Sequence, residues 1–455
     1  MYENYLDFSG ILLIIVYLVV VLAVFRIYGS YRYKNDPITA KYFIWGIVFK
    51  LIVALGFAFI FDIYYDRGGD SYAYFLNSSR LGQVLFDDPS SFFKMFFGLI
   101  NKNNVQILPS DLEYIPGFKD PAKFFVHRLI CLFTIVGLKH FYLTIICLNV
   151  FLYAFVWKVF RFFNSLFPDK HRLLAIAFLF VPSVTFWGSG MVKDSFTYTF
   201  AFVFVVCFYK IILNRQLRLG NIILTIFCMY IVLSLKPYIF YAALVGMFLW
   251  FGLVYTSKIK SRALRVFVLP IAMVLVGIGG MYAITSVMTK VGGAYKDVDS
   301  MLNKAVIAQQ DLKRDYYKGA SFDIGDYDPT LTGALSVTPA AILAGLYRPF
   351  IWEARSIVMI LSGLENMVLM LLTLYVLFRA GPVFMLRQLS KEPFLVFCFV
   401  FSFIMAMGIG LSTSNFGALV RFKIPLIPFF LLGWLFIYDN YRKSRQMQSL
   451  KDSIK

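Results

Sequence analysis

The sequence predicts an all-α polytopic membrane protein with about 11 transmembrane helices. Three observations carry this prediction. Of the 455 residues, 60% are hydrophobic and only 15% are charged, whereas a soluble domain has about 25% charged residues. The mean hydropathy is +0.73. The apolar runs are long and recur along the whole chain, as membrane spans do. We see no internal repeat and no separate soluble region, so residues 1–455 are expected to form one integral-membrane domain.

The expected spans are apolar runs separated by short polar or basic gaps. They cover residues 10–28, 41–62, 141–160, 173–189, 194–213, 219–235, 238–256, 264–287, 351–378, 393–411 and 423–439. The first run follows the acidic start MYENYLDFSG rather than a basic segment, so we expect no cleavable signal peptide.

Basic residues cluster in alternate gaps between these runs. The gaps 26–41, 158–172, 210–218, 258–265 and 379–392, with the tail from Asp439, hold 23 Lys and Arg but 5 Asp and Glu. The rest of the chain holds 21 and 20. The positive-inside rule assigns the basic gaps to the cytoplasm. The N-terminus is then expected outside, and the basic tail 440–455 in the cytoplasm.

Two long segments are expected on the outer face, at residues 63–140 and 288–350. Within the first, residues 90–100 (SSFFKMFFGLI) are short and amphipathic, which predicts an interfacial helix. Residues 122–139 are apolar, but a span there would place the basic gap 158–172 outside. We therefore expect a re-entrant or interfacial helix at 122–139.

Several chemistries find no support in the sequence. The five cysteines lie in apolar segments without a CxxC pair, and the three histidines lack metal-ligand spacing. There is no P-loop, GxGxxG, HExxH or GxSxG motif in a suitable context. The net charge of +19 is explained by topology, so we expect no nucleic-acid partner.

The unusual polar residues gather in the outer turns. These turns read YYDRGGDSYAYF (64–75), PSVTFWGSGMVKDS (182–195), LKPY (235–238), LYRPFIWEARS (346–356) and STSNFGALVRFK (412–423). Charged groups near lipid are costly unless they are solvated, paired or used. Their recurrence on one face predicts a single outer cavity. The candidate site residues are Asp66, Asp70, Tyr74, Lys193, Asp194, Lys236, Arg348, Trp352, Glu353, Asn415 and Arg421.

The chemistry of these residue types suits a phosphate-linked sugar. Lys and Arg bind phosphate, and the guanidinium of Arg offers a bidentate fork. A carboxylate suits proton abstraction from a sugar hydroxyl, and aromatic rings suit stacking on sugars or anchoring at the interface. Of the two acids we favour Asp70 as the base, because the glycines before it can turn the chain back toward the membrane. A divalent metal, Mg²⁺ or Mn²⁺, would be able to bridge Asp66 or Asp70 to phosphate, but nothing in the sequence demands one.

Structural explanations stand beside these assignments. Asp66, Asp70 and Asp194 are also suited to helix N-termini, and Arg348 and Arg421 to snorkelling at the interface. Lys236 would serve as a topology marker, and Glu353 would pair with another loop charge. Inside the membrane, Glu365 lies about 20 Å into its span at 1.5 Å per residue. A proton relay from Glu365 to Lys50 would favour a transporter.

The outer-turn motifs resemble those of the polytopic GT-C class of glycosyltransferases. GGDSYAYF is similar to the acidic loop motif of that class, and PSVTFWGSGMVKDS, YRPFIWEA and NFGALVRFK resemble stretches of uncharacterised bacterial members. The resemblance implies Asp70 or Asp66 as catalytic base and Lys193, Arg348 and Arg421 as phosphate ligands. The acidic loop here is expected to follow two spans rather than one, and we expect no large C-terminal outer domain. The layout also resembles polysaccharide polymerases of the EpsG and Wzy type.

The sequence therefore favours a glycosyltransferase or polysaccharide polymerase at the outer face of a bacterial cytoplasmic membrane. The expected partners are a polyprenyl-phosphate-linked sugar donor, a glycan, lipid or protein acceptor, and membrane lipids. An alternative is a transporter or flippase for an anionic lipid-linked glycan, although we see no repeats of the kind that alternating access uses. A scaffold subunit of an envelope complex is a third possibility.

Overall fold

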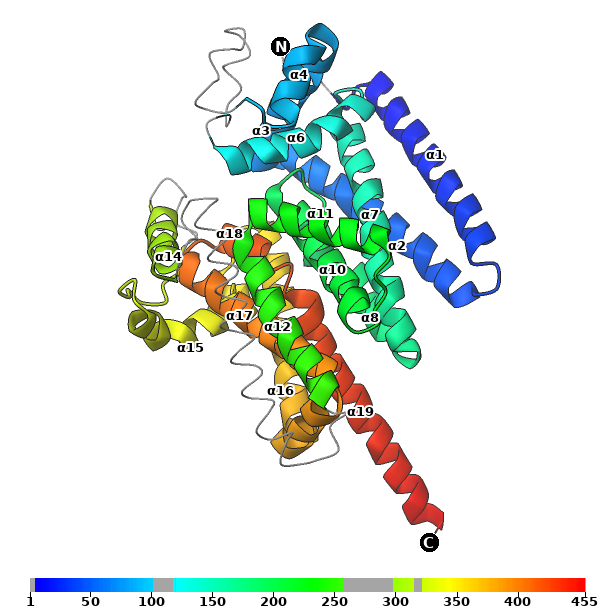
Figure 1. Cartoon of the computed structure of the whole chain (residues 1–455), viewed down its shortest axis with the longest axis vertical. Helices are drawn as coiled ribbons and strands as arrows, with labels where there is room; N and C mark the ends of the chain where they lie inside the picture. The colour runs from blue at the N-terminus through cyan, green and yellow to red at the C-terminus, as the bar shows by residue number, and fades with distance from the viewer. Residues whose placement is uncertain (1–4, 101–117, 119, 257–297, 315–320, 455) are drawn as a thin grey trace. The chain divides into compact units, whose positions relative to one another are not determined.

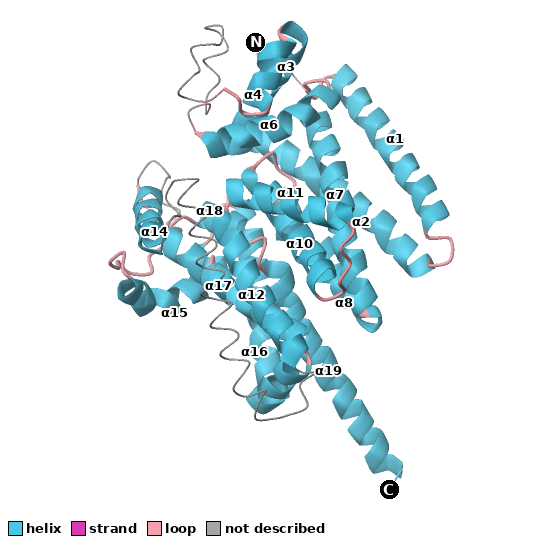
Figure 2. Ribbon diagram, in the orientation of Figure 1, coloured by secondary structure: helices cyan, strands magenta, loops and turns pink. Residues whose placement is uncertain are grey.

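The structure, a computed structural model, describes residues 5–100, 118, 120–256, 298–314 and 321–454. These residues are helical almost throughout, and the part of the chain described holds no β-strand beyond an isolated bridge between Ser321 and Asn415 (Figure 2). They form two units. Unit 1 comprises Met1–Pro168, Phe178–Cys207 and Ile222–Lys236, and unit 2 comprises Asp169–Ala177, Phe208–Asn221 and Pro237–Lys455.

Seven helical segments of the described chain are long and apolar enough to cross a membrane. They are α1 (Phe8–Arg32), α2 (Pro37–Phe59) with its continuation η1 (Ile60–Tyr64), α7 (Phe141–Leu166), α10 (Lys193–Ile212), α12 (Pro237–Thr256), α16 (Ile357–Lys391) and α17 (Pro393–Ser412). An eighth span results if α18 (Phe416–Phe422) and α19 (Ile427–Ile454), bent by 63°, are counted together. The predicted all-helical, membrane-embedded fold is confirmed, whereas the count of 11 is not.

The missing spans have identifiable causes. The run 173–189 is not one helix, because α8 (His171–Leu179) ends before Pro182 and the short α9 (Pro182–Trp187) follows it. The run 219–235 forms α11 (Leu219–Leu235), whose 17 residues extend about 26 Å, less than the hydrocarbon core. The run 264–287 lies outside the described residues.

Unit 1 is built around α2 and α7. Both pack against α1 (Figure 1). Helix α2 also packs against α9. The segment predicted on the outer face, 63–140, adds α3 (Asp70–Asp87), α4 (Pro89–Phe96) and α6 (Pro121–Val136), which pack on one another around Leu81, Phe92 and Phe124. The 16 residues of α6 extend about 24 Å, too short for a straight span. This length agrees with the prediction that 122–139 is not a transmembrane helix.

Unit 2 is built around α17, which packs against α12, α19, α14 (Val298–Leu312) and α15 (Leu331–Tyr347). Two glycines bring α15 and α17 close together. A Cβ on Gly345 would overlap the backbone of Ala406, and a Cβ on Gly410 would overlap the carbonyl of Ala341. Small residues at such crossings are typical of helix packing in membranes. The short η5 (Ile351–Glu353) leads from α15 into α16.

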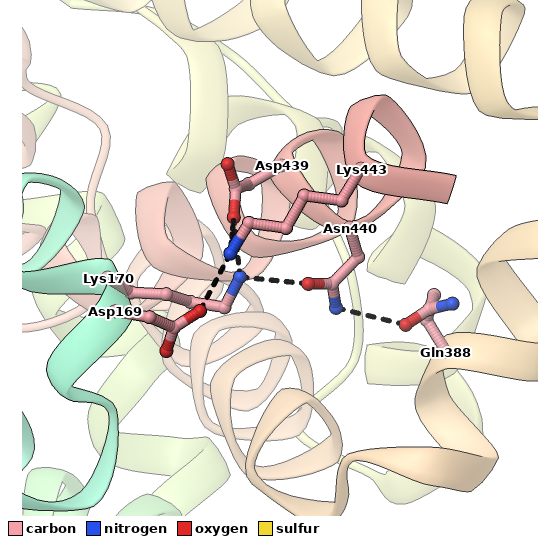
Figure 3. Close-up of polar contacts among 6 residues, drawn as sticks. All are labelled: Asp169, Lys170, Gln388, Asp439, Asn440 and Lys443. Carbon is pink, nitrogen blue, oxygen red and sulfur yellow. Dashed lines mark hydrogen bonds and ion pairs between the residues drawn. The ribbon is translucent and has the colours of Figure 1, made fainter. Parts of the chain in front are cut away.

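Segments that the charge count assigns to the cytoplasm meet at one end of unit 2. The Lys170 ammonium contacts Asp439 Oδ2 at 2.7 Å and Asn440 Oδ1 at 2.8 Å, and Lys443 contacts Asp169 Oδ2 at 2.7 Å (Figure 3). Asn440 also donates to Gln388 Oε1 at 3.0 Å. Three basic gaps, 158–172, 379–392 and the tail, therefore share one polar network.

Candidate functional site

The acidic turn 64–75 in unit 1, the first of the turns predicted on the outer face, begins with a π-helical distortion. Helix α2 widens into η1, and this places Asp62 inside the protein with 4% of its surface exposed. The Arg67 Nε donates to Asp62 Oδ1 at 2.9 Å, and the Tyr142 hydroxyl donates to Oδ2 at 3.0 Å. Both carboxylate oxygens of Asp62 are therefore engaged. Such distortions of an α-helix often occur at functional sites.

The chain reverses direction directly after η1. Asp66 and Arg67 both adopt left-handed backbone conformations, with φ of 45° and 60°. Each costs roughly 1–2 kcal/mol for a residue with a side chain. The Arg67 amide donates to Phe61 O at 3.0 Å, which closes the reversal. This strained turn brings Arg67 back over Asp62, and Gly69, with φ of 87°, leads into α3.

A cavity of about 500 Å³ opens at this turn. Its lining combines charge with apolar surface and consists of Asp62, Ile63, Asp66, Arg67, Gly69, Tyr72, Ala73 and Leu76. Asp66 is exposed, and no described residue forms an ion pair or hydrogen bond with its carboxylate. Asp70 begins α3 and is not part of the lining. The lining of the cavity therefore includes both an acidic residue, Asp66, and a basic residue, Arg67.

A second outer turn reaches the same region of unit 1. Lys193, the first residue of α10, interacts electrostatically with Asp70, Asp120 and Asp194. The backbone amide of Met191 donates to the Ser71 hydroxyl at 3.1 Å. Lys193 is thus within electrostatic range of Asp70, and the segments 64–75 and 182–195 lie together.

The turn before Lys193 is buried and held by polar side chains. The Lys50 ammonium donates to Gly188 O at 2.9 Å, and the Asn149 amide donates to Ser189 O at 2.9 Å. The Ser195 hydroxyl donates to Gly190 O at 2.5 Å. Non-helical backbone inside a membrane protein needs such partners. Lys50 thus supports this turn, and the relay from Glu365 to Lys50 stays a prediction. In unit 2, Glu365 interacts electrostatically with Lys423.

Asp194 and Lys236 form a buried ion pair in unit 1, and their side chains are 4% and 9% exposed. The third outer turn, 235–238, is therefore joined to the second through Lys236. Tyr74 lies on α3 with its ring against His127 of α6, the centroids 5.1 Å apart. The Asp194 carboxylate, the Lys236 ammonium and the Tyr74 ring each contact another group within the protein, so the geometry supports a structural role for these three residues.

The remaining candidates lie in unit 2. Arg348 forms a bidentate pair with Glu353, with Nε 3.0 Å from Oε1 and 3.2 Å from Oε2. Its guanidinium carbon also lies 4.7 Å from the ring centroid of Phe322 and 5.5 Å from that of Phe416. The interpretation that Glu353 pairs with another loop charge therefore describes this structure. The pairing occupies the face of Arg348 that a phosphate would use.

Asn415 caps a helix, and Trp352 faces outward. The Asn415 side chain accepts from the amides of Gly417 and Ala418 at the start of α18, at 2.9 and 3.2 Å. Trp352 is 74% exposed and stacks on Phe350.

Arg421 is half-buried in α18, with its guanidinium over the ring of Phe422. Close to it, Lys423 is 1% exposed and donates to Leu346 O at 3.2 Å and Arg348 O at 3.0 Å.

The five polar turns thus divide between the two units. The turns 64–75 and 182–195 lie in unit 1, and the turns 346–356 and 412–423 lie in unit 2. The turn 235–238 contributes Lys236 to unit 1 and continues into unit 2 at Pro237. The single cavity joining Asp70, Lys193, Arg348 and Arg421 stays a prediction. Within the described residues, no three His, Cys, Asp or Glu side chains are grouped as metal ligands would be.

Four buried or half-buried polar residues escaped the sequence prediction of the site. Asp62, Arg67, Tyr142 and Lys423 each lie at or near the edge of an apolar run, where hydropathy counts them with the span. One feature of the sequence could have predicted the Asp62–Arg67 pair. The two residues carry opposite charges, lie five residues apart and flank the end of a span. No protein-family model, curated protein or solved structure matches this chain.

Proposed function

We propose that this protein is a membrane glycosyltransferase or polysaccharide polymerase that takes its sugar from a polyprenyl-phosphate-linked donor at the outer face of a bacterial cytoplasmic membrane. The observation that carries the proposal is the cavity of about 500 Å³ at the end of α2. It joins an exposed carboxylate, Asp66, with the guanidinium of Arg67 at the end of a span. A donor anchored in lipid would present its phosphate and sugar at this level.

In this reaction an acceptor hydroxyl oxygen bonds to the anomeric carbon of the donor sugar, and the bond from that carbon to the phosphate oxygen breaks. The hydroxyl proton passes to a carboxylate, and polyprenyl phosphate leaves with the bonding electrons. The lining of the cavity supports Asp66 rather than Asp70 as that base. Arg67, and Lys193 beside Asp70, are suited to stabilise the charge that develops on the phosphate.

The strain at Asp66 and Arg67 supports a functional turn. Left-handed conformations of two successive residues with side chains persist only when the surroundings hold them. Here the Asp62–Arg67 pair and the hydrogen bond that the Arg67 amide donates to Phe61 O supply that support. The arrangement keeps Asp66 exposed at the cavity while Arg67 is fixed beside it.

One observation favours the second candidate, a transporter or flippase for an anionic lipid-linked glycan. Between α9 and α10, residues 188–192 form a buried, non-helical turn supported by Lys50 and Asn149. Interrupted helices of this kind line the binding sites of many transporters. A transporter would use the basic groups for binding, and it would not depend on a carboxylate for bond cleavage.

Sugar transfer by purified protein in liposomes tests the proposal. The probe is a polyprenyl-phosphate-hexose labelled in the sugar, supplied with a membrane extract of the source cells as acceptor. We expect transfer by the wild type and a loss of at least 100-fold in Asp66→Asn, the scale of general base catalysis. Asp87→Asn, at the exposed end of α3, is the matched control and should keep full activity. Movement of the labelled lipid between leaflets without cleavage would instead support the transporter.

A further inference from the structure

Two helices of unit 2 carry the same pair of residues at the same spacing. On α16, Arg379 follows Tyr375 by four residues, and on α19, Arg442 follows Tyr438 by four residues. Residues four apart lie on one face of a helix, one turn from each other. Each arginine is therefore stacked beyond its tyrosine, toward the end that the charge count assigns to the cytoplasm.

These two faces meet. The hydroxyls of Tyr375 and Tyr438 are 3.5 Å apart, and the ring centroids are separated by 5.5 Å. Arg379 and Arg442 both interact electrostatically with Tyr438. The four side chains therefore form one patch, which we name the Tyr–Arg patch.

The charges on the neighbouring face of α19 are neutralised, whereas those of the Tyr–Arg patch are not. Asp439 and Lys443 pair with Lys170 and Asp169 in the polar network of Figure 3. By contrast, Arg379 and Arg442 have no hydrogen bond or ion pair with any described residue. Two exposed cations from adjacent helices thus remain beside two hydroxyl donors.

The patch lies where lipid headgroups are expected. Arg379 is 22 residues beyond Ile357, where α16 begins, a distance of about 33 Å along a helix, close to the thickness of the hydrocarbon core. Immediately afterwards α16 kinks at Gly381, whose φ is 75°. The segment beyond exposes Val383 and Leu386 beside the basic Arg387. Apolar and basic groups in that combination are typical of a helix lying in the membrane interface.

We propose that the Tyr–Arg patch binds the phosphate of an anionic phospholipid in the leaflet on this side of the membrane. Two guanidinium groups supply forks for phosphate oxygens, and the tyrosine hydroxyls supply further donors. Basic pockets between transmembrane helices at this level bind anionic headgroups in other membrane proteins. The argument uses only α16 and α19, so it is independent of the proposed sugar transfer.

Lipid binding by the full-length protein tests the assignment. The protein is placed in phosphatidylcholine nanodiscs, phosphatidylglycerol is titrated in, and bound lipid is counted by native mass spectrometry. We expect the double variant Arg379→Gln/Arg442→Gln to bind phosphatidylglycerol roughly thirtyfold more weakly. The matched control, Lys391→Gln/Arg445→Gln, removes the same charge from exposed positions of the same two helices and should bind like the wild type. Equal weakening in both double variants would overturn the patch as a specific site.

Two further measurements test whether binding requires the guanidinium forks and whether the ligand is a lipid rather than a soluble anion. Arg379→Lys/Arg442→Lys keeps the charge but loses the forks, so we expect an intermediate loss, with unchanged unfolding temperature in pure phosphatidylcholine. Retention of full binding by this variant would contradict the forked geometry. Inorganic phosphate in detergent should leave the unfolding temperature unchanged, whereas phosphatidylglycerol should raise it. Equal stabilisation by both would assign the patch to a soluble anion and overturn the lipid proposal.

Discussion

The guanidinium of Arg67 contacts the carboxylate of Asp62 at 2.9 Å, across the point where α2 ends and the chain reverses. Asp62 belongs to the buried end of a span, and Arg67 lines the cavity. The pair therefore connects the membrane-embedded framework of unit 1 to the surface that carries Asp66. A charge buried at 4% exposure requires such a partner.

Substitutions of Asp62 and Asp66 should separate an effect on stability from an effect on activity. Asp62→Asn replaces one acceptor oxygen with an NH₂ group that would face a donor from Arg67 or Tyr142. We expect a loss of about 2 kcal/mol in the free energy of unfolding, measured by thermal denaturation in detergent. Asp66→Asn, exposed and unpaired among the described residues, should unfold like the wild type while losing sugar transfer. A stable Asp62→Asn protein would contradict the structural role of the pair.

The buried pair of Asp194 and Lys236 should behave as a coupled unit. Asp194→Asn leaves the Lys236 ammonium without its charge partner at 9% exposure, and we expect a loss of about 3 kcal/mol. In the double variant Asp194→Asn/Lys236→Met, no uncompensated charge is buried, so the total loss should be smaller than the sum of the single losses. A double-mutant cycle measures this coupling, and strict additivity would refute it.

Substitution by alanine should affect stability differently at two glycines of α17, Gly408 and Gly410. Gly410→Ala forces a methyl group against the carbonyl of Ala341 on α15, and we expect it to cost about 1–3 kcal/mol. Gly408→Ala, whose added methyl group meets nothing within 4 Å, should be neutral or slightly stabilising. Both are scored by unfolding temperature. Similar behaviour of the two variants would refute the close α15–α17 crossing.

Much of the fold follows from hydropathy alone. The predicted runs at 10–28, 141–160 and 393–411 each correspond to a single helix, because a continuous apolar run leaves the backbone few other ways to satisfy its hydrogen bonds in lipid. The break within 173–189 was missed, because the residues around Pro182 remain apolar on both sides. Hydropathy indicates which residues avoid water, and it is the same for a straight helix and for an interrupted one. Here the interruption is stabilised by hydrogen bonds from Lys50 and Asn149.

The site was predicted less completely, because residue type does not specify the partner. Asp194 and Lys236 lie 42 residues apart in the chain and still pair. The sequence predicts both as site residues, but nothing in it predicts that they pair with each other. Arg348 and Glu353 are only five residues apart, yet their pairing depends on the turn through η5. The sequence predicts the acidic residues of the site in the outer turns. Asp62 lies at the end of an apolar run, so hydropathy includes it in the membrane span.

The polar network of Figure 3 predicts a pH dependence through a neighbouring carboxyl group, Glu392. Glu392 joins α16 to α17, and burial raises its pKa, with Asp169 adding to the rise and Lys170 opposing it. A raised pKa in the folded state means that its stabilising contribution is complete below the unfolded value of about 4.3. That contribution is lost as the pH rises through the folded pKa.

Glu392→Gln should therefore stabilise the protein at pH 7, by roughly 2 °C in unfolding temperature, and the gain should disappear near pH 4. Asp169→Asn should act in the opposite sense. The hydrogen bond from Lys443 lowers the pKa of Asp169, so its contribution is present above the unfolded value and lost as the pH falls. We expect Asp169→Asn to destabilise the protein at pH 7, and this loss should shrink as the pH falls below the unfolded value of about 3.9. Destabilisation at pH 7 by Glu392→Gln would show that the ionised carboxylate, rather than the neutral acid, is the form that this network favours.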